Sequence, residues 1–548
     1  MCGICGIYRF AGDERVSPGS LQAMCDTMVH RGPDDEGIRC LGNAGIGMRR
    51  LSIVGVADGR QPISNEDGSL QLVCNGEIYN YPELKAGLEA RGHRFRTHSD
   101  AECIVHLYEE HGERCVEHLR GMFAFAVVDT KSGTLYLCRD RLGIKPLFYA
   151  AGRRALAFGS EIKAILALEN VDRDMDYGAL DTYFAYGYIP SPLTIFKGIR
   201  KLDAGHYLVC RGGTVRTTRY WDLRFAPDHG RSESYFVEKF REIFDETIRI
   251  HLLSEVPLGA FLSGGVDSSL VVSFMGTHVK EPVNAFTVAF QGDSGGYFDE
   301  RRYAREVAAR YACRYTEYEV RPSIGEIVDP IVSAFDEPFA DDSVIPTYNI
   351  CRLAKEDVTV VLTGLGGDEL FAGYERYVGL KLTALFRRLI GAPGWGRLAR
   401  LARRIPEQKG GGETVSRLKR LVEAQGGSLG ASYVNNASSM PRPERALLYS
   451  EETRRRVDSS GCADPGTSHF DRGSGDLLDK AFYHDIKTYL PDDLLALSDR
   501  VGMHHSLELR VPFVDHRLVE FAATIPSALK LRWLEKKYLL KKAAAPFV

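Results

Sequence analysis

The sequence predicts two domains: a sandwich of two β-sheets with helices outside, then a parallel, doubly wound α/β domain with helical additions. In residues 1–205, short apolar runs alternate with Gly, Asp and Asn turns, which is typical of strands joined by turns. Around residues 206–232 the composition changes, and the stretch 225–232 contains Pro, Gly and polar residues. From residue 233 onward, strand-like and helical segments alternate, and this order favours a parallel sheet.

The first region combines predicted strands with predicted helices. Apolar runs bounded by turn residues predict strands at residues 44–48, 70–74, 122–128 and 134–138. Helical patches at 21–29 and 81–90 interrupt these strands. Because a sheet must bury its apolar face against another layer, two packed sheets with the helices outside fit this pattern.

The second region follows a predicted linker at residues 206–232, in which Arg211, Gly212 and Gly213 look like a hairpin turn. The strand-like runs lie at 256–262, 285–290 and 359–362, and the helical segments begin near Ser268 and cover 299–311. We therefore assign residues 1–205 to the first domain and residues 233–548 to the second.

The composition is that of an ordinary globular chain of 548 residues, and its formal net charge of −3 gives no indication of nucleic-acid binding. The 12 cysteines follow no repeating pattern, and the C-x-x-C of Cys2 and Cys5 has no second pair at zinc-like spacing. The first residues lack the layout of a signal peptide, and no apolar run approaches the ~18 residues of a membrane span. We expect a reduced, cytoplasmic location without integral membrane association.

Cys2 becomes the first residue once the initiator methionine is removed, as is common before a small residue. It would then carry a thiol and a free α-amino group, whose ordinary pKa of about 8 suits a base near neutral pH. One residue could thus supply both nucleophile and base, as in N-terminal-threonine enzymes. The alternative, which position alone favours, is an ordinary buried or surface cysteine.

Four residues could complete a site for a substrate amide beside Cys2. Asn75 offers a side-chain N–H₂ and Gly76 a closely approachable backbone N–H, so the pair could hold an oxyanion. The planar fork of Arg50 could clamp an α-carboxylate, and the carboxylate of Asp100 could hold an α-ammonium group. Singly, each is explained as a turn residue or a surface charge. Together with Cys2 they describe a glutamine-shaped site.

These residues lie within longer motifs: MCGICGI, HRGPDDEG, RRLSIV, CNGEIYNY, HSDAE and RDRLGIKPL. From Met1 to about Leu202 the chain resembles the glutaminase domain of class II glutamine amidotransferases. The resemblance implies an αββα N-terminal-nucleophile (Ntn) hydrolase sandwich with Cys2 as the nucleophile. By motif position it also implies glutamine contacts or oxyanion donors at Arg50, Asn75, Gly76, Glu77 and Asp100.

A second motif, LSGGVDSS at residues 262–269, follows a strand-like run. A Gly-rich turn that opens a helix binds anions, because its free backbone N–H groups and the helix dipole point at the ligand. The Lys of a G-x-x-x-x-G-K-S/T loop is missing, which argues against a Walker-type NTPase. Asp267 could hold Mg²⁺ against phosphate oxygens. For SGG alone, a simple turn with a capping Ser is the alternative.

This segment resembles the pyrophosphate loop of ATP pyrophosphatases, which cleave ATP to AMP and pyrophosphate while adenylating a carboxylate. A second acidic cluster follows a later strand in VVLTGLGGDELFAGY. Residues 489–521 have a helical pattern that includes polar residues expected to be buried. With both domains in this order, nearly the whole chain resembles the glutamine-hydrolysing asparagine synthetase family.

This resemblance implies a glutamine-dependent, amide-forming ligase that uses ATP and Mg²⁺ to adenylate an acceptor carboxylate, aspartate in that family. It makes Lys537 the lysine that steadies developing phosphate charge, the alternative being a helix-surface lysine. It makes Asp267 and Asp368 the Mg²⁺ ligands. It places ATP beside Leu262, Ser263, Gly264, Gly265, Asp267, Ser268, Val288, Thr363 and Gly364. A homodimer is a further family expectation.

Two features depart from the family pattern. Leu365 stands where many asparagine synthetases have an acidic residue, and a leucine can neither transfer a proton nor bind an ammonium group. Glu369 could substitute; otherwise the acceptor is a different carboxylate, such as a sugar acid or a secondary metabolite. The chain also ends at Val548, where the family usually continues with helical sequence, so we expect an incomplete C-terminus.

Other interpretations stay open at this point. A β-lactam-synthetase-like enzyme would have an inactive glutaminase domain. The presence of Cys2, Arg50, Asn75 and Asp100 argues against this interpretation. A non-catalytic scaffold could dock through the basic residues of 387–420, which are either solvated helix faces or an electropositive surface for an anionic partner or membrane. The SGGVDSS motif and Asp368 argue against a scaffold, whereas Leu365 leaves it open. The same motif argues against a phosphoribosyl-transferring or sugar-phosphate amidotransferase, which shares only the first domain.

Overall fold

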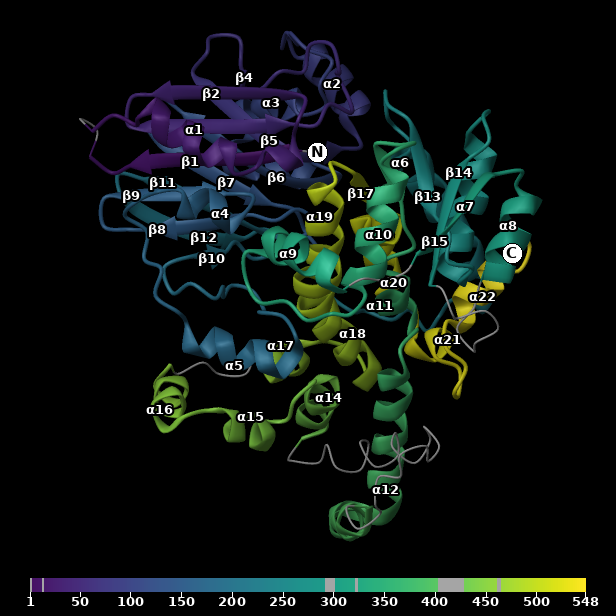
Figure 1. Ribbon diagram of the computed structural model, residues 1–548. Helices are drawn as coiled ribbons and strands as arrows, with labels where there is room; N and C mark the ends of the chain where they lie inside the picture. The colour runs from purple at the N-terminus through teal and green to yellow at the C-terminus, as the bar shows by residue number, and fades with distance from the viewer. Residues whose placement is uncertain (1, 12–13, 291–300, 321–323, 403–427, 461–464) are drawn as a thin grey trace.

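A computed structural model of the chain describes all residues except 1, 12–13, 291–300, 321–323, 403–427 and 461–464. Within this part, the strands form two six-stranded antiparallel sheets followed by one five-stranded parallel sheet. Figure 1 shows the two antiparallel sheets, in purple and blue, beside the parallel sheet in teal. The predicted fold class, an αββα sandwich followed by a doubly wound α/β domain with helical additions, is confirmed.

The first antiparallel sheet holds the N-terminal strand near its centre. Its strands follow the order β10–β8–β9–β1–β3–β2. They are β1 (Cys2–Arg9), β2 (Asp35–Leu41), β3 (Ala44–Arg50), β8 (Phe148–Ala151), β9 (Ala155–Gly159) and β10 (Arg200–Lys201). Because β1 pairs with both β3 and β9, Cys2 lies at the end of an inner strand, opposite Arg50.

The second antiparallel sheet has the order β12–β11–β7–β6–β5–β4. Its strands are β4 (Ile63–Ser64), β5 (Leu70–Ile78), β6 (Gly121–Asp129), β7 (Thr134–Arg139), β11 (His206–Arg211) and β12 (Thr214–Arg219). The strands predicted at 70–74, 122–128 and 134–138 lie within β5, β6 and β7, and the one at 44–48 lies within β3.

The segment 206–232, assigned to a linker from the sequence, begins with two strands in the structure. β11 and β12 form a hairpin, and β11 also pairs with β7, so both strands extend the second sheet. The predicted turn is present, and Gly212 and Gly213 both have positive φ, at 53° and 82°. Residues 220–232 alone therefore connect the sandwich to the next helix without regular structure.

The alternation of side chains along β6 explains how the sheets stack. Ala124 and Ala126 pack with residues of the first sheet such as Ile46, whereas Phe123 and Phe125 pack under helix α3 (Glu102–His111). Successive side chains of a strand point to opposite faces, so β6 fills two layers at once. The small residues face the other sheet and the large ones face the helix.

Helices cover the outer faces of the sandwich. α1 (Pro18–Asp26) and α4 (Ile162–Leu166) cover the first sheet, and α3 with α2 (Tyr81–Ala90) covers the second. The helix predicted at 81–90 coincides with α2. The one predicted at 21–29 starts earlier, because Pro18 suits a first helical turn, and gives way at Thr27 to the 3₁₀ turn η1 (Val29–Arg31).

The parallel sheet has the order β15–β14–β13–β16–β17. Its strands are β13 (Leu258–Phe261), β14 (Asn284–Phe290), β15 (Arg314–Val320), β16 (Val360–Leu362) and β17 (Glu508–Arg510). The chain moves outward from β13 to β15 and then returns to the other side at β16. In doubly wound sheets, ligands bind beyond the carboxyl ends of the strands at such a switch point. The loops after β13 and β16 meet there.

Helices cover both faces of this sheet. One layer contains α6 (Glu233–His251), α7 (Val266–His278), α8 (Arg301–Arg310) and α22 (Tyr538–Ala544). The other contains α9 (Ile324–Phe335), α10 (Val344–Ala354) and α19 (Leu495–His504). Ala260 and Leu262 face the first layer while Phe286 and Val361 face the second, so these strands are apolar on both sides.

The remaining helices lie around the carboxyl edge of the sheet and below it in Figure 1. They are α5 (Tyr177–Tyr186), α11 (Gly367–Phe371), α12 (Glu375–Ala402), α14 (Leu429–Ala437), α15 (Arg442–Leu448), α16 (Glu451–Ser459), α17 (Pro465–Arg472), α18 (Leu477–Lys487), α20 (His516–Ala522) and α21 (Ser527–Lys530), with the short turns η3 (Leu490–Leu494) and η4 (Pro512–Val514). The remaining short turn, η2 (Gly112–His118), follows α3 in the first domain and packs on the second antiparallel sheet. Of the basic segment 387–420, residues 403–420 lie outside the described residues. Among the described helices, none combines the length and apolar character that a membrane span requires.

Candidate active sites

The start of β1 places Cys2 between the two antiparallel sheets. The backbone N–H of Cys2 donates to Asn75 Oδ1 on β5 at 3.0 Å, and the strand register sets Cys2 opposite Arg50. Only 6% of Cys2 is exposed, and burial raises the pKa of its thiol. The thiol is therefore protonated at neutral pH and needs a base before it can act as a nucleophile.

Asn75 and Gly76 follow one another on β5 beside this thiol. The Asn75 side chain is fully buried, and its Nδ2 has no hydrogen-bond partner among the described residues. A buried donor without a partner is costly, so this N–H₂ is available to a substrate oxygen. At Gly76 a Cβ would lie 2.1 Å from the Met122 carbonyl oxygen, so only glycine fits there.

Arg50 and Asp100 are buried near the same end of β5. Arg50 Nη2 donates to the carbonyl oxygens of Val54 and Gly55 at 3.1 and 2.7 Å, which fixes its guanidinium. Asp100 Oδ2 accepts the Ile78 N–H at 2.6 Å. Burial raises the pKa of Asp100 to about 6, so the carboxylate is still ionised at neutral pH. The two side chains thus offer fixed groups of opposite charge.

Glu77 points toward the second domain. Its Oε2 lies 3.4 Å from Arg510 Nη2 on β17, and Arg510 Nε donates to Glu508 Oε1 at 2.6 Å. Burial, together with the nearby Glu508 carboxylate, raises the pKa of Glu77 well above its ordinary value. The structure therefore engages Glu77 in the contact between the domains. It gathers the other predicted residues of this site: Cys2, Arg50, Asn75, Gly76 and Asp100.

The second candidate site lies at the switch point of the parallel sheet. Asp267 is in the first turn of α7, after β13, and Asp368 is in the first turn of α11, after β16. Lys537 Nζ lies 2.5 Å from Asp267 Oδ2 and 2.7 Å from Asp368 Oδ1. Burial acts to lower the pKa of Lys537, but the two carboxylates raise it, so the side chain is a cation.

Three glycines let the backbone pack closely against Asp267 and Asp368. A Cβ at Gly364 would lie 2.7 Å from Ser268 N, one at Gly367 would lie 2.5 Å from Asp267 Cγ, and one at Gly373 would lie 1.6 Å from Asp368 Oδ1. Real Cβ atoms essentially never come within 3.0 Å of such neighbours. These three of the four glycines of the TGLGGDELFAG segment are therefore required by close packing around the two carboxylates.

The loop from Leu262 to Ser269 forms a turn suited to an anion. Ser263 Oγ lies 3.0 Å from Ser268 Oγ and accepts the Gly265 N–H at 3.2 Å, and Gly264 has a φ of +89°. Within the described residues, no side chain caps the start of α7 at Gly265. The first N–H groups of this 13-residue helix thus remain for an anion such as a phosphate.

The carboxylates of Asp267 and Asp368 fit a Mg²⁺ site. Both lie within 2.7 Å of one ammonium nitrogen, so they face a common point. Carboxylate oxygens are the ligands that Mg²⁺ prefers, usually one or two of them together with substrate phosphates. The adjacent helix start would hold those phosphates.

The other predicted ATP contacts divide into two groups. Thr363 and Gly364 lie at the switch point, where the Thr363 N–H donates to the Arg510 carbonyl oxygen at 2.9 Å. Leu262 directly follows β13 and Val288 is on the neighbouring β14, but Leu262 is buried on the face covered by α7 and Val288 packs on the opposite face. The structure does not bring these two side chains together.

Glu369, beside Asp368, is only 1% exposed. The Tyr374 hydroxyl donates to its Oε1, and its Oε2 has no hydrogen-bond partner in the described part of the chain. Burial raises the pKa of Glu369 to about 7, so this carboxyl can hold or release a proton near neutral pH. Leu365 is partly buried against the core and offers no such group.

A cavity of about 540 Å³ is lined in part by Arg376 and Tyr489, two residues that pack against the Tyr374 ring. Arg376 lines it, with its guanidinium between the rings of Tyr374 and Tyr489, at 4.2 and 4.5 Å from their centroids. The rest of the lining is mostly aromatic or acidic, including Tyr183, Phe184, Tyr186, Tyr188, Asp341, Asp342, Asp485 and Asp493. Cavities of about 300–1,000 Å³ hold small-molecule ligands. The sequence analysis did not predict this cavity. The aromatic run YFAYGY at residues 183–188 is the local feature that could have indicated it.

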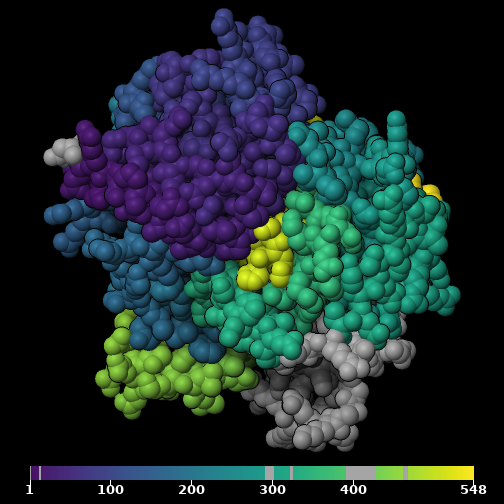
Figure 2. All heavy atoms as spheres, turned by 45° about the horizontal axis from the view of Figure 1, so that its top comes forward, coloured from purple at the N-terminus to yellow at the C-terminus, as the bar shows by residue number. Residues whose placement is uncertain are grey.

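Buried charges join the two domains. Figure 2 shows the N-terminal residues in purple meeting teal, green and yellow residues over a broad front. Arg31 Nη1 lies 2.9 Å from Asp499 Oδ2, and Arg120 Nε lies 2.8 Å from Asp515 Oδ2. The buried-polar character predicted for 489–521 is confirmed at these positions and at Arg510. No local pattern could have paired them, because each partner is hundreds of residues away.

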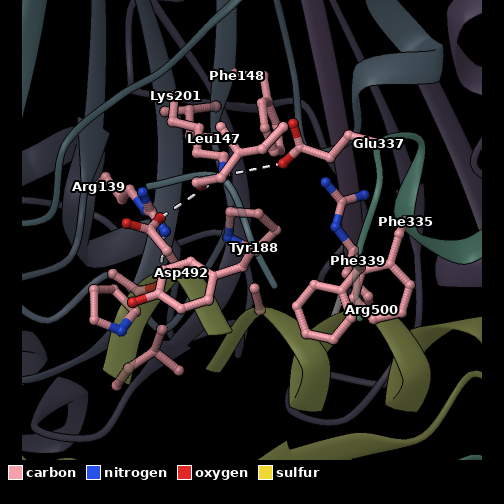
Figure 3. Close-up of a pocket in the computed structure, with 16 residues that line it drawn as sticks. Arg139, Leu147, Phe148, Tyr188, Lys201, Phe335, Glu337, Phe339, Asp492 and Arg500 are labelled. Carbon is pink, nitrogen blue, oxygen red and sulfur yellow. Dashed lines mark hydrogen bonds and ion pairs between the residues drawn. The ribbon is translucent and has the colours of Figure 1, made fainter. Parts of the chain in front are cut away.

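A small cavity at the same boundary is lined by charged side chains (Figure 3). Lys201 Nζ lies 3.0 Å from Glu337 Oε1 and 3.9 Å from Asp492 Oδ1, and Arg500 also lines the space. Its volume is about 30 Å³, room for about two water molecules. It is therefore a contact between domains that is too small for a substrate.

Comparison with protein families agrees with this division. Residues 1–221 match a family model described as a glutamine amidotransferase domain, and residues 239–548 match one described as asparagine synthase. The chain is therefore a glutamine amidotransferase domain joined to a synthetase domain.

Three full-length relatives carry the comparison further. Asparagine synthetase (glutamine-hydrolyzing) 1 of Bacillus subtilis is 34% identical over 561 residues, which covers 100% of this chain and 85% of that protein. Asparagine synthetase (glutamine-hydrolyzing) 3 of the same organism is 31% identical, covering 99% and 84%. Amidase chry2 of Gibberella zeae is 30% identical, covering 100% and 87%. The chain belongs to the glutamine-hydrolysing asparagine synthetase family.

Proposed function

We propose that the protein releases ammonia from glutamine at Cys2 and uses it to convert an ATP-activated carboxylate to an amide, with aspartate as the first candidate acceptor. The observation that carries this proposal is the meeting of Lys537 with Asp267 and Asp368 at the switch point. A glutaminase alone needs no such group, whereas adenylation needs both a metal site and a cation beside the phosphates.

The glutaminase half requires removal of Met1, which turns the Cys2 nitrogen into an α-amine. That amine takes the thiol proton, and the sulfur attacks the glutamine amide carbon, whose oxygen becomes an oxyanion facing Asn75 Nδ2 and the Gly76 N–H. The amine then protonates the leaving nitrogen, and ammonia departs from a thioester. Water, deprotonated by the same amine, hydrolyses the thioester to glutamate and restores the thiol. Arg50 and Asp100 hold the α-carboxylate and the α-ammonium group.

In the second half, an oxygen of the acceptor carboxylate attacks the α-phosphorus of ATP, and pyrophosphate leaves. The start of α7 and Lys537 hold the phosphates, and Asp267 and Asp368 would hold Mg²⁺. That ion, when bound, supplies positive charge to the phosphate oxygens. Ammonia then attacks the acyl carbon of the adenylate, AMP leaves, and one proton is lost as the amide forms. Glu369, which follows Asp368 and has a pKa of about 7, is a buried carboxyl able to take it.

A short chain of residues connects the two candidate sites. Glu77, directly after Gly76, contacts Arg510, and the Arg510 carbonyl oxygen accepts the Thr363 N–H at the second site. This route supports transfer of ammonia through the contact between the domains, where bulk water is excluded and ammonia stays unprotonated.

A larger acceptor is the second candidate. Leu365 stands where the family resemblance implies an acid, and the 540 Å³ cavity lined by Arg376 exceeds what aspartate fills. Its acidic and aromatic lining, with one arginine, favours a carboxylate that also carries a positive group and a ring or chain. A cytoplasmic location and a homodimer belong to the same proposal.

The test is pyrophosphate release with ATP, MgCl₂ and glutamine, with aspartate present or absent. Aspartate-dependent pyrophosphate with equimolar asparagine supports aspartate as acceptor. Pyrophosphate that appears only with larger amino-bearing carboxylates supports the second candidate. Glutamate formation without pyrophosphate for any acceptor contradicts the ligase.

A further inference from the structure

Four side chains of the first domain meet on the outer side of the second sheet, away from Cys2. Glu66 lies in the turn between β4 and β5, His93 in the loop after α2, and His106 and Glu109 one helical turn apart on α3. One ligand atom from each lies within 4.8 Å of all the others. We call these four residues the His–Glu cluster.

His106 is the unusual member. Its ring is fully buried, yet neither Nδ1 nor Nε2 has a hydrogen-bond partner in the described part of the chain. Nδ1 lies 3.5 Å from Glu66 Oε2, and Nε2 lies 3.7 Å from Glu102 Oε1. These separations are too long for good hydrogen bonds. A buried imidazole with two unsatisfied nitrogens is costly, so a ligand for it is expected.

The distances in the cluster suit a bridging ion. His93 Nδ1 lies 3.3 Å from Glu66 Oε1 and 3.9 Å from Glu109 Oε2. Ligands about 2.0–2.1 Å from a tetrahedral zinc ion lie about 3.3 Å from one another. Three of the six separations are 3.3, 3.5 and 3.9 Å and all six lie within 4.8 Å, so the ligands would close around an ion by at most about 1.5 Å.

We propose that the His–Glu cluster binds one divalent transition-metal ion, with zinc as the first candidate. Two imidazoles favour zinc over Mg²⁺ or Ca²⁺, which take oxygen ligands. Two glutamates complete a neutral, four-coordinate set. Glu102 and Glu110 lie beside the second ring nitrogens of the histidines: Glu102 Oε1 is 3.7 Å from His106 Nε2, and Glu110 Oε1 is 3.2 Å from His93 Nε2. Carboxylates in such positions orient metal-bound imidazoles. The ion is separate from the Mg²⁺ site.

The ion would fix the segment that carries Asp100. His93 precedes this segment and His106 follows it, while Glu102 accepts the N–H groups of Arg96 and Thr97 at 2.7 Å each. Joining His93 to His106 closes a short loop and limits the motion of Asp100. The consequence for glutamine binding rests on the proposed function, whereas the metal site itself does not.

Metal binding is measured on the untagged, full-length protein after treatment with a chelator. One equivalent of ZnCl₂ is added in excess MgCl₂, which saturates the aspartate site, and bound zinc is counted after dialysis by inductively coupled plasma mass spectrometry. We expect about one zinc ion per chain and a Tm several degrees higher than that of the chelated protein, since an ion that binds only the folded state stabilises it.

Two variants make the result decisive. Glu109→Gln changes an exposed member, and His93→Gln changes a ring that is 13% exposed, so folding of both can be verified by circular dichroism. Each should weaken zinc binding at least 10-fold and abolish the rise in Tm. His98→Gln, in the same loop but paired with Asp58, is the matched control and should bind zinc fully. No stoichiometric zinc in the unsubstituted protein, or equal zinc in His93→Gln and Glu109→Gln, overturns the proposal.

Discussion

The two candidate sites are built in different ways. Around Cys2, backbone pairing positions the groups: Cys2 and Asn75 lie on strands of facing sheets, joined by a hydrogen bond of 3.0 Å. At the switch point, loops and a distant helix position them, and Lys537 lies 270 residues beyond Asp267. The strands of the sandwich fix the positions of the groups in the first site. In the second site, attraction between charged side chains fixes them.

This difference has consequences for reactivity. The first site has a buried, unpaired amide donor ready for an oxyanion, so little needs to move when glutamine binds. In the second site Lys537 pairs with both Asp267 and Asp368, so under the proposed function the arrival of Mg²⁺ and ATP must move its ammonium group toward the phosphates. Substitutions should therefore affect one reaction and spare the other.

The largest effect is expected for Cys2→Ala. Without the thiol no thioester forms, and glutamine hydrolysis should fall by on the order of 10³-fold or more. Glutamate release is measured with an enzyme-coupled assay. Cys40→Ala, at an exposed cysteine on β2, is the control and should keep full activity. Substantial glutamate release by Cys2→Ala would exclude Cys2 as the nucleophile.

Lys537→Ala should remove pyrophosphate formation by about 10²–10³-fold, because a cation beside the developing phosphate charge is lost. Lys536→Ala is the matched control, since Lys536 pairs with Glu375 at the surface, 2.6 Å away. Glutamate release without an acceptor should be unchanged in both variants. Equal pyrophosphate rates for the two lysine variants would leave Lys537 without a role in catalysis.

Asn75→Ala should lower glutamine hydrolysis by about 10²-fold, the usual effect of losing one oxyanion donor. Pyrophosphate formation from added ammonium chloride should stay within about twofold. Asn43→Ala, whose side-chain amide donates to the Arg9 carbonyl oxygen at 2.8 Å, serves as the control. A loss of the ammonia-dependent reaction as well would show that Asn75 supports the fold rather than the oxyanion.

The smallest effect concerns pH. Asp100 is ionised above its pKa of about 6 and neutral below it, and only the carboxylate attracts the α-ammonium group of glutamine. In the Cys2→Ala background, the Kd for glutamine should rise about tenfold per pH unit below pH 6 and level off above it. Calorimetry between pH 4.5 and about 8 measures this. The same break in Cys2→Ala/Asp100→Asn would assign the titration to another group.

Sequence patterns predicted the architecture because it depends on local periodicity. The alternation along β6 and the apolar run of β13 follow directly from residue order. The hairpin of β11 and β12 was placed in a linker, because Arg216 and Arg219 make β12 polar and its strand character depends on pairing with β11.

Contacts between distant residues could not be predicted in the same way. The family motif predicts Glu77 as a glutamine contact, yet its carboxylate lies beside Arg510. No sequence pattern links these two residues, which are more than 400 positions apart. Lys537 was placed at the phosphate site by resemblance alone. The His–Glu cluster draws on three separate elements and has no compact sequence motif. Such partners become visible only once the chain is folded.

The separation of the two sites is tested most directly by giving the Cys2→Ala variant ammonium chloride in place of glutamine and measuring pyrophosphate and amide formation. Both products should form at the rate of the unsubstituted enzyme with ammonium chloride, while glutamine supports neither. Loss of the ammonia-dependent reaction in a folded variant would contradict two chemically independent sites.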